Sequence, residues 1–263
     1  MLLIGQAICQ NHMGLAELHR LRDGTKSEDS RKKYRTKART RFRRAIGLAE
    51  QAKALAIKVD DVVFAQARDG AEGIVWQILP VDLWELVARD YLCRALDRDE
   101  AITGYRDVIL ARLRVIDEDD PAYAAGHYVQ LCRLAIELVR LVYRAGEADA
   151  PVEVQLLESE TDGTEFLRLA DWAIDEVMED AIARYVAIAG DRHPWLLSWF
   201  DARLIRAAAQ WAGDAAETAV KEAQTFFPAD MIARRPDLAA AMTLFRQRVE
   251  ACRKANLLGA ASV

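Results

Sequence analysis

Apolar residues recur at steps of three and four along almost the whole chain of 263 residues. This spacing places them on one side of an α-helix, whereas a half-buried strand would need strict alternation. Prolines interrupt the pattern at 80, 121, 151, 194 and 228. Proline disrupts the interior of a helix and is tolerated in its first turn, so each marks a boundary. The sequence therefore predicts an all-α fold of consecutive antiparallel helical hairpins, either an α-solenoid or an irregular bundle.

The periodicity also predicts where the helices begin and end. We expect Ser27 and Asp120 to cap two of them, because serine and aspartate accept hydrogen bonds from the first free amides of a helix. The segment 59–78 is interrupted by Gly70 and Gly73, and residues 74–79 could be extended instead. The predicted helices cover residues 2–20, 28–57, 59–78, 82–97, 99–117, 121–146, 164–189, 194–212, 214–227 and 236–255.

The stretch 121–146 is apolar around most of its circumference, which predicts a central helix covered on several sides. Its polar residues are confined to one narrow stripe. The stripe consists of Gln130, Arg133, Glu137, Arg140 and Arg144. It is either a solvated edge of a buried helix or an arginine-lined groove, in which case Arg133, Arg140 and Arg144 would contact a partner protein.

Residues 31–44 form the most basic segment, with nine lysines and arginines and no acidic residue. The basic residues are Arg31, Lys32, Lys33, Arg35, Lys37, Arg39, Arg41, Arg43 and Arg44. In a helix they would surround a stripe made of Tyr34, Ala38, Phe42, Ala45 and Ala49. Such a face is solvated or pairs with acidic residues of the same chain, or it binds nucleic acid, an acidic protein or an anionic membrane.

Charge is unevenly distributed along the chain, whose formal net charge is −5. Residues 1–53 carry a balance of +8, and residues 54–263 a balance of −13. An asymmetry of this size indicates an interaction surface or two regions that attract each other. We therefore divide the chain into a basic segment, 1–57, and an acidic helical body, 58–263.

Residues 200–228 contain small and apolar residues at helical-hairpin spacing, followed by a proline. Ala216, Val220, Ala223 and Pro228 match the second helix and closing proline of a tetratricopeptide repeat, and Phe200 suits its opening aromatic position. The segment thus resembles a tetratricopeptide repeat, although Arg203, Leu204 and Ala207 depart from the pattern of its first helix. The resemblance implies stacked hairpins that bind proteins on a concave face.

No motif for a metal or a nucleotide cofactor is present in the sequence, so we expect neither. The four histidines are scattered, and the aromatic cluster of Trp195, Trp199 and Phe200 indicates core packing or a partner-binding patch. The four cysteines (Cys9, Cys93, Cys132 and Cys252) lie far apart in helical patterns. We expect them to be buried in a protein of the reducing cytoplasm.

Together these features favour binding over catalysis. The first hypothesis is a non-catalytic protein-interaction scaffold or adaptor, a subunit of a larger assembly whose partner is a protein. The second is a nucleic-acid-binding protein that uses residues 31–44, and the third is a helical enzyme with an unrecognised carboxylate site. We expect no secretory signal and no transmembrane segment, while the homo-oligomeric state stays open.

Overall fold

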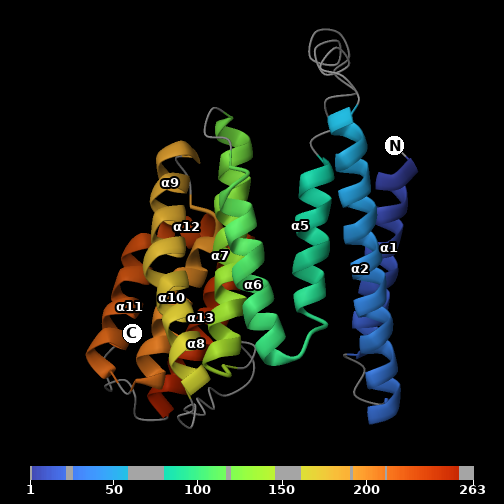
Figure 1. Cartoon of the computed structure of the whole chain (residues 1–263). Helices are drawn as coiled ribbons and strands as arrows, with labels where there is room; N and C mark the ends of the chain where they lie inside the picture. Colours follow the sequence, from blue (N-terminus) through green and yellow to red (C-terminus); the bar gives the residue numbers. More distant parts are fainter. Residues whose placement is uncertain are drawn as a thin grey trace. The chain divides into compact units, whose positions relative to one another are not determined.

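The computed structural model describes residues 2–21, 26–58, 80–116, 120–145, 161–189, 192–210 and 212–254. Every regular element in these ranges is a helix and none is a strand, which confirms the predicted all-α class (Figure 1). The helix predicted at 59–78 lies outside the described residues. The arrangement of the helices as a solenoid stays a prediction.

The chain forms two compact units, residues 1–104 and 105–263, and the division falls within helix α6 (Arg98–Leu113). The first unit contains α1 (Leu2–Leu21), α2 (Glu28–Lys58) and α5 (Pro80–Cys93). It therefore groups α5 with the basic helix, whereas the sequence placed a boundary after residue 57.

The apolar stripe of α2 forms the core of the first unit. Ala38, Phe42, Ala45 and Ala49 are almost completely buried, as their spacing predicts. Leu18 of α1 and Leu92 of α5 pack against this stripe from two sides. Helices α1 and α2 run antiparallel to each other (Figure 1). At the start of α2, Ser27 accepts a hydrogen bond from the amide of Ser30.

The second unit is built around α7 (Pro121–Val142), whose predicted central position is confirmed by its burial. Asp120 caps it by accepting from the amide of Tyr123 at 3.1 Å. Around α7 lie α8 (Thr161–Trp172), the π-helix η1 (Ala173–Met178), α9 (Glu179–Ala189), the 3₁₀ turn η2 (Pro194–Leu196) and α10 (Leu197–Ala209).

Three helices complete the second unit. These are α11 (Gly213–Phe226), α12 (Ala229–Arg234) and α13 (Pro236–Lys254). Helix α11 packs against α10 through Ala216, Val220 and Ala223, the positions shared with the tetratricopeptide pattern. The short α12 was not predicted, because it has no buried residue and hence no apolar stripe.

A π-helical turn joins α8 to α9 without a break in the helix. Four of its six residues are buried: Ala173, Ile174, Val177 and Met178. The wide turn also leaves a carbonyl available, since Trp199 of α10 donates from Nε1 to the oxygen of Ile174 at 3.1 Å. This bond fixes the indole of Trp199 against η1.

Among the helices in the described ranges, none combines the length and the apolar character needed to cross a bilayer.

Candidate functional site

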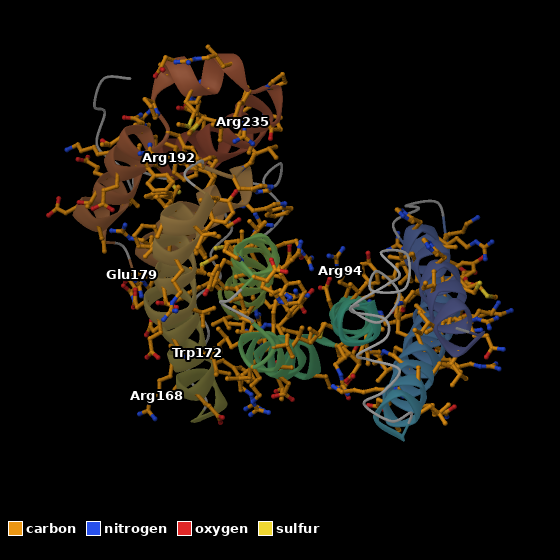
Figure 2. The ribbon with its side chains drawn as sticks, turned by 90° about the horizontal axis from the view of Figure 1, so that it is seen from above. Arg94, Arg168, Trp172, Glu179, Arg192 and Arg235 are labelled. Carbon is orange, nitrogen blue, oxygen red and sulfur yellow. The ribbon has the colours of Figure 1, made fainter. Side chains whose placement is uncertain are left out.

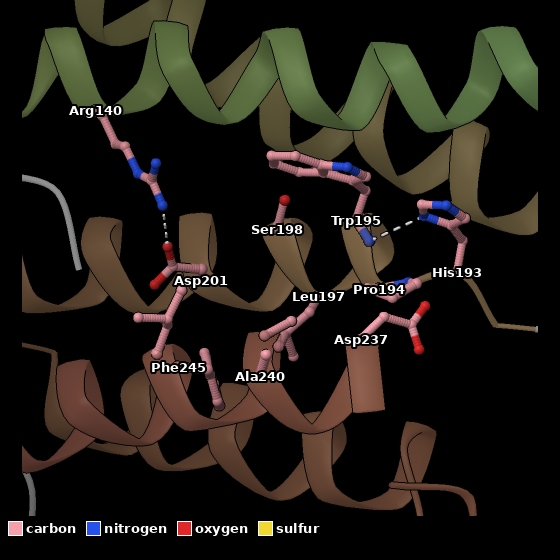
Figure 3. A pocket seen from close by; sticks show the side chains of 12 residues that line it. Arg140, His193, Pro194, Trp195, Leu197, Ser198, Asp201, Asp237, Ala240 and Phe245 are labelled. Atoms are coloured by element: carbon pink, nitrogen blue, oxygen red, sulfur yellow. Dashed lines mark hydrogen bonds and ion pairs between the residues drawn. The ribbon is translucent and has the colours of Figure 1, made fainter. Parts of the chain in front are cut away.

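A pocket of about 420 Å³ opens in the second unit between α7, the η2–α10 segment and α13 (Figure 3). Its position follows from helix packing, since α13 contacts both α10 and η2, and α7 also contacts both. The η2 turn begins at Pro194, where the sequence predicted a boundary. His193 caps the turn, since its Nδ1 accepts a hydrogen bond from the amide of Trp195 at 3.2 Å. This turn holds Trp195 at the pocket.

Most of the pocket wall is apolar. Pro194, Trp195 and Leu197 line it from the η2–α10 segment, and α13 contributes Ala240, Ala241, Leu244 and Phe245. Trp195 and Leu244 retain 41% and 46% of their surface exposed. Large apolar side chains that stay open to solvent beside a pocket are typical of a binding surface.

One end of the pocket holds a cluster of three charged side chains. Arg140 of α7 forms an ion pair with Oδ2 of Asp201 of α10, with Nη2 and Oδ2 separated by 3.1 Å. The other carboxylate oxygen of Asp201, Oδ1, pairs with Arg248 of α13. The side chain of Arg248 is 1% exposed, so its ion pair with Asp201 offsets the cost of removing the guanidinium from water. Arg140 also approaches Glu137 at 3.5 Å, and Figure 3 shows it reaching from α7 toward Asp201.

At the start of α13, Asp237 lines the pocket and is held by a neighbouring arginine. Arg235 donates from Nη2 to Asp237 at 2.8 Å, and this hydrogen bond lowers the pKa of Asp237 below its ordinary value. Arg235 also donates from Nη1 to the carbonyl of Arg192 at 3.0 Å (Figure 2). These bonds join the start of α13 to the segment before η2.

The structure separates the residues that the sequence predicted for partner binding. Arg140 and Trp195 line the pocket, whereas Arg133 donates to Gln130 of its own helix at 2.7 Å. Trp199 is half-buried beside Phe200, with ring centroids 5.0 Å apart. Arg144 is exposed just after α7, at a positive φ of 50°.

Sequence reasoning missed Ser198, Asp201, Leu244 and Phe245 as pocket residues. Asp201 carried the one available signal, because it is a charged residue among the buried apolar positions of α10. Its partners lie far away in sequence, so spacing along one helix cannot reveal them.

Three of the nine basic residues predicted as a binding site pack within the first unit. Arg39 donates from Nε to the carbonyl of Ala95 at 2.6 Å, and Arg41 donates to Gln10 of α1 at 3.1 Å. Arg35 and Arg39 both pair with Asp97, at 3.3 and 3.0 Å. The hydrogen bond and charge of Arg39 are the main causes of the lowered pKa of Asp97.

The other six of the nine predicted basic residues are exposed. Arg31 lies in the first turn of α2, near Ser27. Five others form no ion pair within the described part of the chain: Lys32, Lys33, Lys37, Arg43 and Arg44.

Three of the four cysteines lie inside the two units. Cys93, Cys132 and Cys252 are buried as predicted, but Cys9 is exposed, which corrects the prediction for that residue. Helix α1 turns Ala7, Asn11 and Gly14 inward, and Cys9 lies on another side of the helix. Within the described ranges, no group of three or more His, Cys, Asp or Glu side chains is placed to hold a metal ion.

No protein-family model matches the chain, and no curated protein or solved structure is significantly similar to it.

Proposed function

We propose that this protein is a non-catalytic interaction module that holds a segment of a partner protein in the pocket between α7, the η2–α10 segment and α13. The observation that carries the proposal is the exposure of Trp195 and Leu244 beside a pocket of about 420 Å³. A pocket of this size can take one large side chain with its neighbouring backbone.

The apolar wall favours a partner segment with an aromatic or branched aliphatic anchor. Burying such a side chain contributes about 1.5–3 kcal/mol, before the cost of ordering the segment is subtracted. Tryptophan at the mouth suits this role, because it adds a large contact area with few rotatable bonds.

The polar groups favour an acidic residue beside that anchor. Asp201 and Asp237 are already engaged by arginines, which makes them poor acceptors for a ligand. Arg140 keeps 23% of its side chain exposed and has more N–H groups than its two carboxylate partners use. A carboxylate of the partner would therefore bind at Arg140, with the Ser198 hydroxyl as a further donor.

The same ion pairs argue for binding instead of proton transfer. Asp201 is held between Arg140 and Arg248, so an arginine engages each of its two carboxylate oxygens. Asp237 is stabilised as an anion by Arg235.

Panning of a random peptide library against the whole protein tests the proposal. Peptides are selected on the wild type and counter-selected on Leu244→Glu, which places a charge at the pocket mouth. We expect a consensus with one large apolar residue and an acidic residue close to it. Replacing that acidic residue with its amide is expected to weaken binding about tenfold, the loss of one charge-assisted hydrogen bond.

Leu167→Glu is the matched control, because Leu167 is an exposed leucine of the same unit, on α8, and does not line the pocket. Selected peptides should bind this variant as they bind the wild type. Equal binding to Leu244→Glu, or a selection without any apolar anchor, would contradict the proposal.

A further inference from the structure

The exposed side of α2 carries an uninterrupted basic surface in the first unit. We define the basic face as Lys32, Lys33, Lys37, Arg43 and Arg44, with Thr36 and Thr40 between them. Lys33, Lys37, Thr40 and Arg44 follow steps of four, three and four, and Lys32, Thr36 and Arg43 form the neighbouring row. The helical rise places Lys32 and Arg44 about 18 Å apart along the axis.

The packing of α2 decides which basic residues belong to this face. Phe42 and its stripe point into the core of the first unit, and Arg39 and Arg41 are bound to Ala95 and Gln10 beside that stripe. The basic face lies on the opposite side of the helix. No acidic residue occurs between positions 30 and 49, so nothing on this stretch of α2 neutralises it.

The structure argues against a membrane as the ligand of the basic face. A helix that binds a bilayer inserts an apolar face beside its basic residues. In α2 the apolar side is already covered, because Ala38 and Phe42 form a cluster with Ala95, against which Leu18 and Tyr91 pack. Within residues 31–44, every exposed side chain of α2 is therefore a lysine, an arginine or a threonine, and none is apolar.

A folded protein partner is also disfavoured, because protein interfaces depend on buried aromatic and aliphatic anchors. The basic face offers only lysine, arginine and threonine. The hydroxyls of Thr36 and Thr40 donate to carbonyls of α2 itself, at 3.0 Å each. What the face can bind is a regular array of anions.

We propose that the basic face of α2 binds the phosphate backbone of nucleic acid without sequence preference. This site is independent of the pocket in the second unit. Binding of this kind releases counterions, so affinity falls linearly on a logarithmic salt scale. With four phosphate contacts, the dissociation constant for duplex DNA should rise roughly 100-fold between 50 and 200 mM salt.

Fluorescence anisotropy with the full chain tests this site, using labelled duplexes of about 20 base pairs in two unrelated sequences and a single strand of the same length. The double variant Lys33→Glu/Arg44→Glu should weaken duplex binding at least about tenfold at 50 mM salt. Lys33→Gln/Arg44→Gln should lower the salt slope by about 1.8, since two contacts are lost.

Arg168→Glu/Arg246→Glu is the control, because it changes the net charge equally at two exposed residues of the second unit. It should alter duplex affinity by less than about threefold, since it leaves every residue of the basic face unchanged. Circular dichroism checks that each variant is folded.

Two outcomes overturn nucleic-acid binding by this face. One is equal loss of affinity in the Lys33/Arg44 reversal and in its control, which would make the effect one of net charge. The other is binding to phosphatidylserine vesicles or polyglutamate in the absence of any duplex or single-strand binding. A strong preference for one of the two duplex sequences would overturn the claim of backbone recognition.

Discussion

His127 of α7 is a histidine buried in the second unit. The guanidinium of Arg112 lies against its ring, with Nη1 and Nδ1 separated by 3.2 Å. The ring of Tyr123 covers it at a centroid distance of 4.3 Å. Burial, and secondarily the charge of Arg112, lower the pKa of His127 to about 4, so the imidazole is neutral and accepts from the arginine.

This pair makes stability depend on pH in a defined window. The folded-state pKa of about 4 lies below the ordinary value of 6.5, so the unfolded chain binds the proton first. Stability is therefore complete above pH 6.5 and is lost as the pH falls toward 4. We expect a loss of about 2–3 kcal/mol in the free energy of unfolding between pH 7 and 4.5 from this residue.

Urea denaturation of wild type and His127→Gln measures that contribution. Glutamine keeps an acceptor for Arg112 but does not titrate, so its stability should decline less over the same range. Identical pH profiles for the two proteins would show that His127 is not the titrating group.

Asp201 illustrates the limit of sequence reasoning at the scale of single residues. The stripe of α7 identified Arg140 as a candidate, and the proline at 194 marked the boundary at which η2 begins. The carboxylate that joins Arg140 to Arg248 could not be found in this way, because it depends on how three separate helices pack. Side-chain spacing predicts which residues share a face of one helix, and it does not predict which helices pack together.

At the scale of the elements, Gly14 of α1 lies directly against Phe42 of α2. A β-carbon built there would lie 2.5 Å from the ring of Phe42, which is itself fully buried. Gly5 of the same helix has open space around it. The two glycines therefore serve opposite purposes, although both lie in α1.

Substituting each glycine with alanine should change stability in opposite directions. Gly5→Ala should stabilise by about 0.5–1 kcal/mol, because alanine is the better helix former. Gly14→Ala gains the same propensity but must displace Phe42, at a cost of typically 1–3 kcal/mol, so the net change should be destabilising. Thermal denaturation measures both, and a stabilised Gly14→Ala variant would contradict the close packing of α1 on α2.

The sequence predicted most elements well because their stability comes from an apolar stripe. The predicted helices 28–57 and 236–255 differ from α2 and α13 by one residue at one end. Helix α12 was missed since it buries nothing. Helix periodicity reveals buried faces and little else.

At the scale of the whole molecule, the two units differ in charge. Residues 1–104 contain 18 basic and 15 acidic residues, and residues 105–263 contain 18 basic and 26 acidic residues. The first unit thus has only a small excess of basic over acidic residues, and this basic character is concentrated in α2. Net charge describes the basic face poorly, because only charges within a Debye length act on a bound phosphate.

The two proposed sites lie in different units and share no residue, which predicts that they act independently. Leu244→Glu should leave the duplex affinity within about twofold of wild type, as expected for substitutions at sites without shared partners. Lys33→Gln/Arg44→Gln should likewise leave peptide binding unchanged. Anisotropy titrations with both ligands measure this, and mutual loss of binding would reveal coupling between the units.

The π-helix η1 has a geometric consequence for the second unit. Along α8, η1 and α9, buried residues recur every four positions in two parallel series. One series is Ala170, Ile174, Met178 and Ile182, and the other is Ala173, Val177, Ala181 and Tyr185. A regular α-helix would rotate such a series by about 40° at each step and carry it away from α7. The wider turn of η1 rotates less per residue and cancels part of this drift. The π-helical turn between α8 and α9 thus keeps the same side of both helices facing α7, and α8, η1 and α9 all contact it.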